Sequence, residues 1–175
     1  MTRIFSSALV ALMVLGSLAL PTARAQPEGV GVGAALGVTN SAFNQDPVGL
    51  AGKGWISESQ AVSGLTSFYL GSEDQSYWTI RGDYLFHNFN AVSVEQGFLA
   101  LYVGGGIQYT VLEGTNNQWA LRAPTGITYI SNSASLDVFI EIAPALQLAN
   151  PESLRFDGAI GFRYYFSAGS GGSGE

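Results

Sequence analysis

The chain contains one histidine, His87, which is the first candidate for acid–base chemistry. A hydrolase that uses serine, histidine and an acid needs its histidine within hydrogen-bond reach of the nucleophile. The serines nearest to His87 fall in expected turns, whereas the alternation of residues 76–89 places His87 on one polar face with Arg81 and Asp83. We therefore predict a structural histidine and no catalytic residue.

Asp137 and Glu141 are the second candidate, as a general acid and base. Four residues on a strand span roughly 13 Å at ~3.3 Å per residue, which exceeds the ~5–9.5 Å between the carboxyl groups of glycosidases. Each acid is therefore predicted to pair with an arginine. Because the chain has one histidine and no cysteine, it offers no ligand cluster typical of zinc, and no metal or cofactor is predicted.

Residues 104–106 are three consecutive glycines. A phosphate-binding loop would also have a lysine and a following helix, and the sequence provides neither at this place. Glycine inside a strand allows a neighbouring group to approach closely or the strand to bend. We predict that the run lets a bulky side chain cross the interior or lets the wall bend.

Composition restricts the class of protein that must position these residues. Charged residues make up 11% of the 175, well below the roughly 25% of an ordinary soluble domain. Hydrophobic residues reach 47%, but beyond residue 25 no apolar run approaches the ~18 residues of a membrane helix. Without Arg3 and Arg24, five basic and thirteen acidic residues remain, a net charge of 5 − 13 = −8. This charge argues against nucleic-acid binding.

Residues 1–25 have the features of an export signal. Arg3 supplies a basic start, residues 8–20 are apolar, Pro21 follows, and residues 23–25 form an Ala-Arg-Ala cleavage pattern. At the other end, residues 167–175 are rich in glycine and serine, which is typical of a flexible tail. We expect one folded domain over residues 26–166.

The expected domain alternates between apolar and polar residues, with no helical period. In the last segment, for example, Phe156 and Phe162 share one face and Arg155 and Arg163 share the other. Short polar turns separate the segments, and an even number of strands allows a meander to close on itself. Eight strands are predicted, over residues 29–38, 50–57, 61–70, 76–89, 99–111, 118–130, 136–148 and 154–166. Prolines inside two of them, Pro124 and Pro144, are predicted to mark bulges or strand ends.

The charged residues indicate which face is inside. Every basic residue after the leader and four acids fall on the polar face of a predicted strand, and the other nine acids fall in turns or termini. Small membrane barrels have a polar, side-chain-filled interior and an apolar outer band with aromatic girdles. The girdles are expected at Trp78, Tyr109, Trp119, Tyr129 and Tyr164. An interior charge network without a steady pore is predicted for Lys53, Arg81, Asp83, His87, Arg122, Asp137, Glu141, Arg155, Asp157 and Arg163.

Two alternatives stay open from the residues alone. A soluble, lipocalin-like carrier of a small apolar ligand would also have eight strands, with the apolar face inward. An outer-membrane lipid hydrolase would need His87 beside a nucleophile on the lipid-facing surface. A closed membrane barrel is preferred because it pairs every backbone group within hydrocarbon without helices.

Several stretches, taken in order, resemble one family. They are residues 49–53 with Trp55, 83–88, Leu101-Tyr102 with Gly104 and Gly106, Leu121-Arg122 with Pro124, Gly126-Ile127 with Tyr129, 136–144 and 157–166. Together these stretches cover most of residues 48–166, and they resemble small, mostly uncharacterised outer-membrane β-barrels best known from spirochaetes, with an OmpA-like or OmpX-like fold. The resemblance implies an outer-membrane location and no established activity. A final strand that ends in Tyr164 and Phe166 also resembles the signal that the outer-membrane assembly machinery reads.

The sequence therefore predicts an all-β protein, an eight-stranded antiparallel up-and-down transmembrane β-barrel. Exported by a cleaved signal peptide, it would lie in the bacterial outer membrane as a non-enzymatic monomer with a plugged polar lumen and a structural or interaction role in the envelope. Its expected partners are outer-membrane lipids and, during biogenesis, periplasmic chaperones and the assembly machinery, and no nucleic acid is expected to bind.

Overall fold

The computed structural model describes residues 29–39, 47–69, 76–94, 97–112, 116–131, 133–148 and 153–166. Among these residues, no helix is long and apolar enough to cross a membrane. The predicted signal peptide and the predicted tail lie outside the described residues. The strands are β1 (Val30–Thr39), β2 (Val48–Trp55), β3 (Gln60–Tyr69), β4 (Tyr77–Val94), β5 (Gly97–Leu112), β6 (Gln118–Arg122), β7 (Thr125–Ser131), β8 (Leu136–Gln147) and β9 (Ser153–Phe166).

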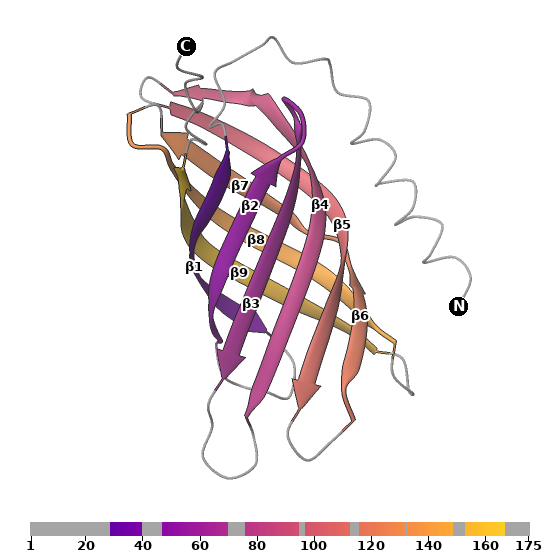
Figure 1. Cartoon of the computed structure of the whole chain (residues 1–175). Helices are drawn as coiled ribbons and strands as arrows, with labels where there is room; N and C mark the ends of the chain where they lie inside the picture. Colours follow the sequence, from indigo (N-terminus) through magenta and orange to yellow (C-terminus); the bar gives the residue numbers. More distant parts are fainter. Residues whose placement is uncertain are drawn as a thin grey trace, which may run out of the picture.

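These strands form one antiparallel sheet that closes into a ring (Figure 1). The last strand, β9, pairs with β1 from Val30↔Phe166 to Thr39↔Asp157. Closure gives every strand two neighbours, so the backbone donors and acceptors can pair without helices. The predicted all-β, up-and-down barrel is confirmed.

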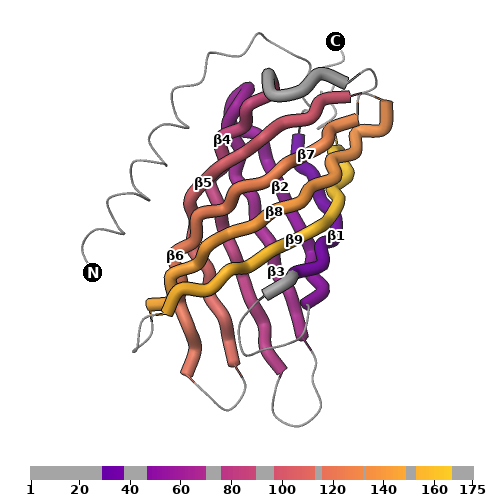
Figure 2. The backbone as a smooth tube through the Cα atoms, turned by 180° about the vertical axis from the view of Figure 1, so that it is seen from behind, coloured from indigo at the N-terminus to yellow at the C-terminus, as the bar shows by residue number. Residues whose placement is uncertain are grey.

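β6 and β7 are two halves of one barrel strand, so the described strands occupy eight positions around the ring. The gap between β6 and β7 consists of residues 123 and 124, so Arg122 and Thr125 are three residues apart. Their partners are also three residues apart, both on β5 and on β8. The register is therefore the same on both sides of the gap. Seen from behind, β6 and β7 follow one line between β5 and β8 (Figure 2).

Two prolines account for the gap. The Ala123 N–H donates to the carbonyl of Pro144 at 3.0 Å, and the Gly104 N–H donates to the carbonyl of Pro124 at 2.8 Å. A proline has no N–H with which to return the bond, so the ladder is interrupted without being shifted. The prediction that the prolines mark bulges or strand ends is correct for Pro124. It is wrong for Pro144, which lies within β8 in unshifted register because its carbonyl still accepts a bond.

One predicted turn is wrong. The sequence predicts a turn over residues 90–97, but β4 continues to Val94 and β5 begins at Gly97. The ladder shifts between Asn88 and Val92, where three residues of β4 face one residue of β5. Such a bulge bends and twists the strand, and it interrupts the alternation on which the prediction depends. Each of the other predicted segments agrees with its strand to within about two residues at either end.

The two ends of the barrel differ in their connections. The terminus end, where β1 begins and β9 ends, has the connections 56–59, 95–96 and 132–135. The loop end, opposite, has the connections 40–47, 70–76, 113–117 and 148–152. The shorter connections therefore gather at the terminus end.

Candidate functional site

Side chains are distributed inside out relative to a soluble protein. On the outer face Ile140 is 61% exposed and Leu154 is 62% exposed, whereas Lys53 and Asp137 inside are 2% and 0% exposed. Within the described ranges, Glu58 in the turn after β2 is the one charged residue classed as exposed. A lipocalin-like carrier requires the apolar face inward, so the structure does not support that alternative.

Aromatic side chains form two groups on the outer face. Near the loop end, the group contains Phe68, Trp78, Tyr109 and Trp119, which pack in pairs. Closer to the terminus end, the group contains Tyr84, Phe86, Tyr164 and Phe166, again in pairs. The indole N–H of Trp78 donates to Thr66 Oγ1 at 2.7 Å, which satisfies its polar atom on an apolar surface. Two such belts are typical of the two membrane interfaces of a transmembrane barrel.

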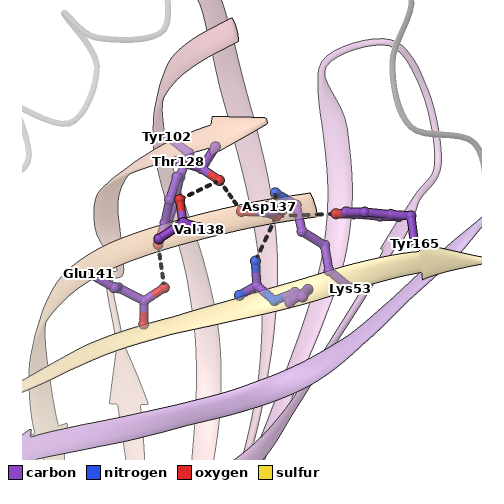
Figure 3. Close-up of polar contacts among 8 residues, drawn as sticks. Lys53, Tyr102, Thr128, Asp137, Val138, Glu141 and Tyr165 are labelled. Carbon is purple, nitrogen blue, oxygen red and sulfur yellow. Dashed lines mark hydrogen bonds and ion pairs between the residues drawn. The ribbon is translucent and has the colours of Figure 1, made fainter. Parts of the chain in front are cut away.

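Asp137 on β8 is the centre of the first group of interior charges (Figure 3). Lys53 Nζ on β2 lies 3.3 Å from its Oδ2, and Arg163 Nη1 on β9 lies 3.0 Å from the same oxygen. The Tyr165 hydroxyl donates to that oxygen at 3.2 Å, and the Thr128 hydroxyl donates to Oδ1. A buried carboxylate is stable only when it is paired and hydrogen-bonded, and donors from β2, β7 and β9 meet that requirement here.

Two cations share this single carboxylate, and aromatic rings contact both. Lys53 Nζ lies 4.4 Å from the centroid of the Trp55 ring, and the Arg163 guanidinium carbon lies 3.8 Å from the centroid of the Phe139 ring. A cation over a ring face is attracted by the ring quadrupole, and more strongly where water is excluded. The rings therefore supply part of the stabilisation of the two cations that a second carboxylate would otherwise provide.

Arg122 on β6 is the centre of the second group. Its Nη1 lies 2.5 Å from Oδ2 of Asp83 on β4, and its Nη2 lies 2.7 Å from Oε1 of Glu141 on β8. The other carboxylate oxygen of Glu141 accepts a hydrogen bond from the Tyr102 hydroxyl at 3.0 Å. The planar fork of arginine suits two carboxylates at once. The three ionised side chains are at most 6% exposed, so the group is closed to bulk water.

Arg155 and Asp157 on β9 form a third pair, with 3.2 Å between Nε and Oδ1. In the orientation that satisfies both neighbours, the Gln108 amide donates to Asp157 at 3.0 Å and accepts from Arg155. Arg81 lies in the same interior and is 6% exposed. No carboxylate of a described residue lies within 4.0 Å of Arg81, so among the described residues Arg81 has no ion-pair partner.

His87 lies on the inward face of β4 and is buried. Its ring centroid lies 4.6 Å from that of Trp55, 5.3 Å from that of Tyr102 and 6.0 Å from that of Phe89. A lipid hydrolase would need this histidine beside a nucleophile on the membrane-facing surface, whereas the structure places it among aromatic rings. Within the described ranges, no group of three or more histidine, aspartate or glutamate side chains could hold a metal ion.

Four uncharged members of these groups, Tyr102, Gln108, Thr128 and Tyr165, were missed by the sequence-based prediction. Each lies on the polar face of its strand, which is the signal that could have identified it. A small neighbour makes space for such a ring: a Cβ on Gly126 would lie 2.5 Å from the Tyr102 ring. Within the glycine run, a Cβ on Gly106 would clash with the Asp83 side chain and the Gly82 carbonyl, so Gly106 allows a close approach of β4 to β5. The predicted crossing by a bulky side chain and the predicted bend of the wall stay predictions.

A closed antiparallel ring with an apolar outer face, two aromatic belts and a charged interior defines a transmembrane β-barrel. No protein-family model and no curated protein matches the chain. Among solved structures, the N-terminal β-barrel domain of Pseudomonas aeruginosa OprF is similar, with a TM-score of 0.63 and 12% identity over 81% of this chain and 100% of that one. Ail, the attachment invasion locus protein of Yersinia pestis, aligns with a TM-score of 0.41 and 13% identity over 79% of this chain and 99% of its own. At this identity, the likeness to the OprF domain shows the fold alone.

Proposed function

We propose that the chain is an integral outer-membrane protein: a monomeric, non-enzymatic β-barrel with a closed polar interior and a structural or interaction role in the envelope. The inside-out burial supports this proposal most directly. A soluble monomer rarely exposes a contiguous apolar patch of more than a few hundred Å², whereas apolar residues cover the outer face of every strand here. Lipid would cover that face.

Three further features support the outer membrane as the location. A barrel is one of the two forms in which a chain can span a membrane, and residues 1–25 have the pattern of an export signal. Outer-membrane barrels have short periplasmic turns and longer outer loops, so the terminus end of this barrel would face the periplasm. Membership of the spirochaete-type family, implied by the resemblance, belongs to the same proposal.

The seam of the ring supports a role for the last strand in assembly. Tyr164 and Phe166 face outward and are 48% and 59% exposed. Phe166 pairs with Val30, the first residue of β1, so the strand that carries the proposed signal is also the strand that closes the barrel. We infer that the assembly machinery reads this strand after periplasmic chaperones have delivered the chain.

The charge groups support a closed interior. Arg122 joins β6 to β4 and β8, and Lys53 joins β2 to β8 across three positions of the ring. The interior of an eight-stranded barrel is just wide enough for side chains to fill. Side chains that bridge separated strands therefore leave little room for a continuous water column.

Cell fractionation with a heat-modifiability gel tests the proposed location and fold. The protein is expected in the detergent-extracted envelope, with a band that migrates differently before and after boiling. Recovery as a soluble periplasmic protein, or identical migration in both samples, would contradict the proposal.

A further inference from the structure

The first group of interior charges has one positive charge that no carboxylate offsets. Lys53 and Arg163 both bind Oδ2 of Asp137 (Figure 3), so two cations share one acid. Trp55 and Phe139 attract these cations through their ring faces, but an aromatic ring has a quadrupole and no net charge. The group therefore has a net charge of 2 − 1 = +1, on side chains that are at most 4% exposed.

The other inward charges of the described residues balance among themselves. The third pair, on β9, is neutral by itself. Arg122 binds two carboxylates, those of Asp83 and Glu141, and Arg81 lies within electrostatic range of both without contacting either. Two cations therefore face two carboxylates in that part of the interior. The excess cation is consequently in the first group.

Hydrogen-bond donors without partners lie beside this excess charge. Arg163 Nε is buried without a hydrogen-bond partner, and neither imidazole nitrogen of His87 has a hydrogen bond of normal geometry among the described residues. The Ser59 carbonyl comes near the imidazole, but one acceptor can serve only one of its two nitrogens. Lys53 has three N–H groups and donates one of them to Asp137. Because Lys53 and Arg163 both lie within electrostatic range of His87, the unpaired donors and the excess charge are in the same place.

Two aromatic rings hold Lys53 and His87 together. The His87 ring centroid lies 4.6 Å from that of Trp55 and 5.3 Å from that of Tyr102. Lys53 Nζ lies 4.4 Å and 5.9 Å from the centroids of the same two rings. Lys53 comes from β2 and His87 from β4, so donors from separated strands meet beside these rings. The result is a buried, positively charged cluster with aromatic walls.

We propose that this cluster binds one small monovalent anion of the size of chloride, at Lys53, Arg163 and His87. A water molecule could accept the same hydrogen bonds, but it would leave the net charge of the group uncompensated, and burying an unpaired charge is costly. The interior of an eight-stranded barrel is just wide enough for side chains to fill, which favours a monatomic anion over a larger one. The site depends on the barrel and its interior and not on the proposed role in the envelope, so the two can fail separately.

Urea unfolding of the refolded full chain in lipid vesicles, with chloride replaced by the larger anion gluconate at constant ionic strength, tests the site. The urea midpoint of wild type is expected to rise with chloride and then to saturate, because a ligand that binds only the folded state stabilises it. At a chloride concentration of about ten times the dissociation constant, the equilibrium constant of unfolding should be about elevenfold lower. An unspecific salt effect would not saturate.

Lys53→Met should abolish the saturable rise, because it removes the excess positive charge. Asp137 keeps Arg163 and two hydroxyl donors as partners, so this variant leaves no carboxylate unpaired and should fold. Arg81→Met is the matched control. It also replaces one buried cation by methionine, but outside the first group, and it should keep the rise.

His87→Phe tests the hydrogen bonds separately from the charge, and it decides the matter if Lys53→Met does not fold. It keeps a ring beside Trp55 and Tyr102 but removes the imidazole donor, so chloride should bind about tenfold more weakly. Three results would overturn the site: a wild-type midpoint that does not respond to chloride, an unchanged chloride affinity in Lys53→Met or in His87→Phe, and loss of the rise in Arg81→Met. The last result would place the anion at Arg81 instead.

Discussion

Replacing Arg122 by alanine tests whether the interior charges are coupled as the geometry indicates. The substitution removes the only cation within 4.0 Å of Asp83 and Glu141 among the described residues. Those carboxylates are 3% and 6% exposed, so they would remain buried without a cation in contact. Breaking a buried pair in this way typically costs about 3–5 kcal/mol. We expect the lower part of that range, because the Tyr102 hydroxyl still binds Glu141.

Urea unfolding of the refolded protein in lipid vesicles, followed by tryptophan fluorescence, measures this loss. Glu58→Gln is the control: it also removes one charge, but at an exposed turn, and no measurable change is expected. Combining Arg122→Met with Asp83→Asn and Glu141→Gln should recover most of the stability, because no uncompensated charge then remains. If Arg122→Ala unfolds at the same urea concentration as Glu58→Gln, the coupling inferred from the distances is wrong.

Three further predictions concern assembly, packing and the lipid face. Phe166→Ala should reduce the membrane-inserted fraction without affecting export, as measured by fractionation; unchanged insertion would show that the signal lies elsewhere. Gly126→Ala should destabilise the barrel by about 1–3 kcal/mol or more through overpacking against the Ile140 carbonyl and the Tyr102 ring, whereas Gly105→Ala, whose Cβ meets nothing within 4 Å, should not. Ile140→Arg, on the outer face near the middle of β8, should cost about 2–4 kcal/mol in lipid vesicles, and an unchanged urea midpoint would argue against a lipid-facing position.

The alternation of apolar and polar residues was sufficient to predict most of the fold, because one face of each strand points outward and the other points into the interior. Where a strand departs from regular pairing, that signal fails. Phe89 faces inward at a bulge, and the residues after it do not alternate, so a turn was predicted where β4 continues. Pro144 was predicted to mark a bulge or a strand end, but β8 continues through it. Proline lacks the N–H donor, yet its carbonyl still accepts a hydrogen bond from the Ala123 N–H of the neighbouring strand.

The candidate site was predictable as a set of residues but not as a set of pairs. The polar face of each strand identified every charged residue that the structure places inside. Which of them meet depends on the stagger of the strands, which the sequence does not reveal. Lys53 and Asp137 are 84 residues apart and come together across three positions of the ring, whereas Arg81, on the same face of β4 as Asp83, does not join an ion pair with a described residue.

Apolar residues on the inward face explain how this interior accommodates more cations than acids. Among the described inward residues there are five cations and four carboxylates, and Asp137 serves two of the cations at once. Trp55 and Phe139 each present a ring to one of those two cations, so the aromatic rings belong to the electrostatics as well as to the packing. Trp55 also packs against Phe89, with 5.7 Å between the ring centroids. One side chain therefore contacts both Lys53 and the apolar cluster of Phe89, Ala100 and Ile130, and loss of the Lys53–Asp137 pair should loosen both the charged group and that cluster.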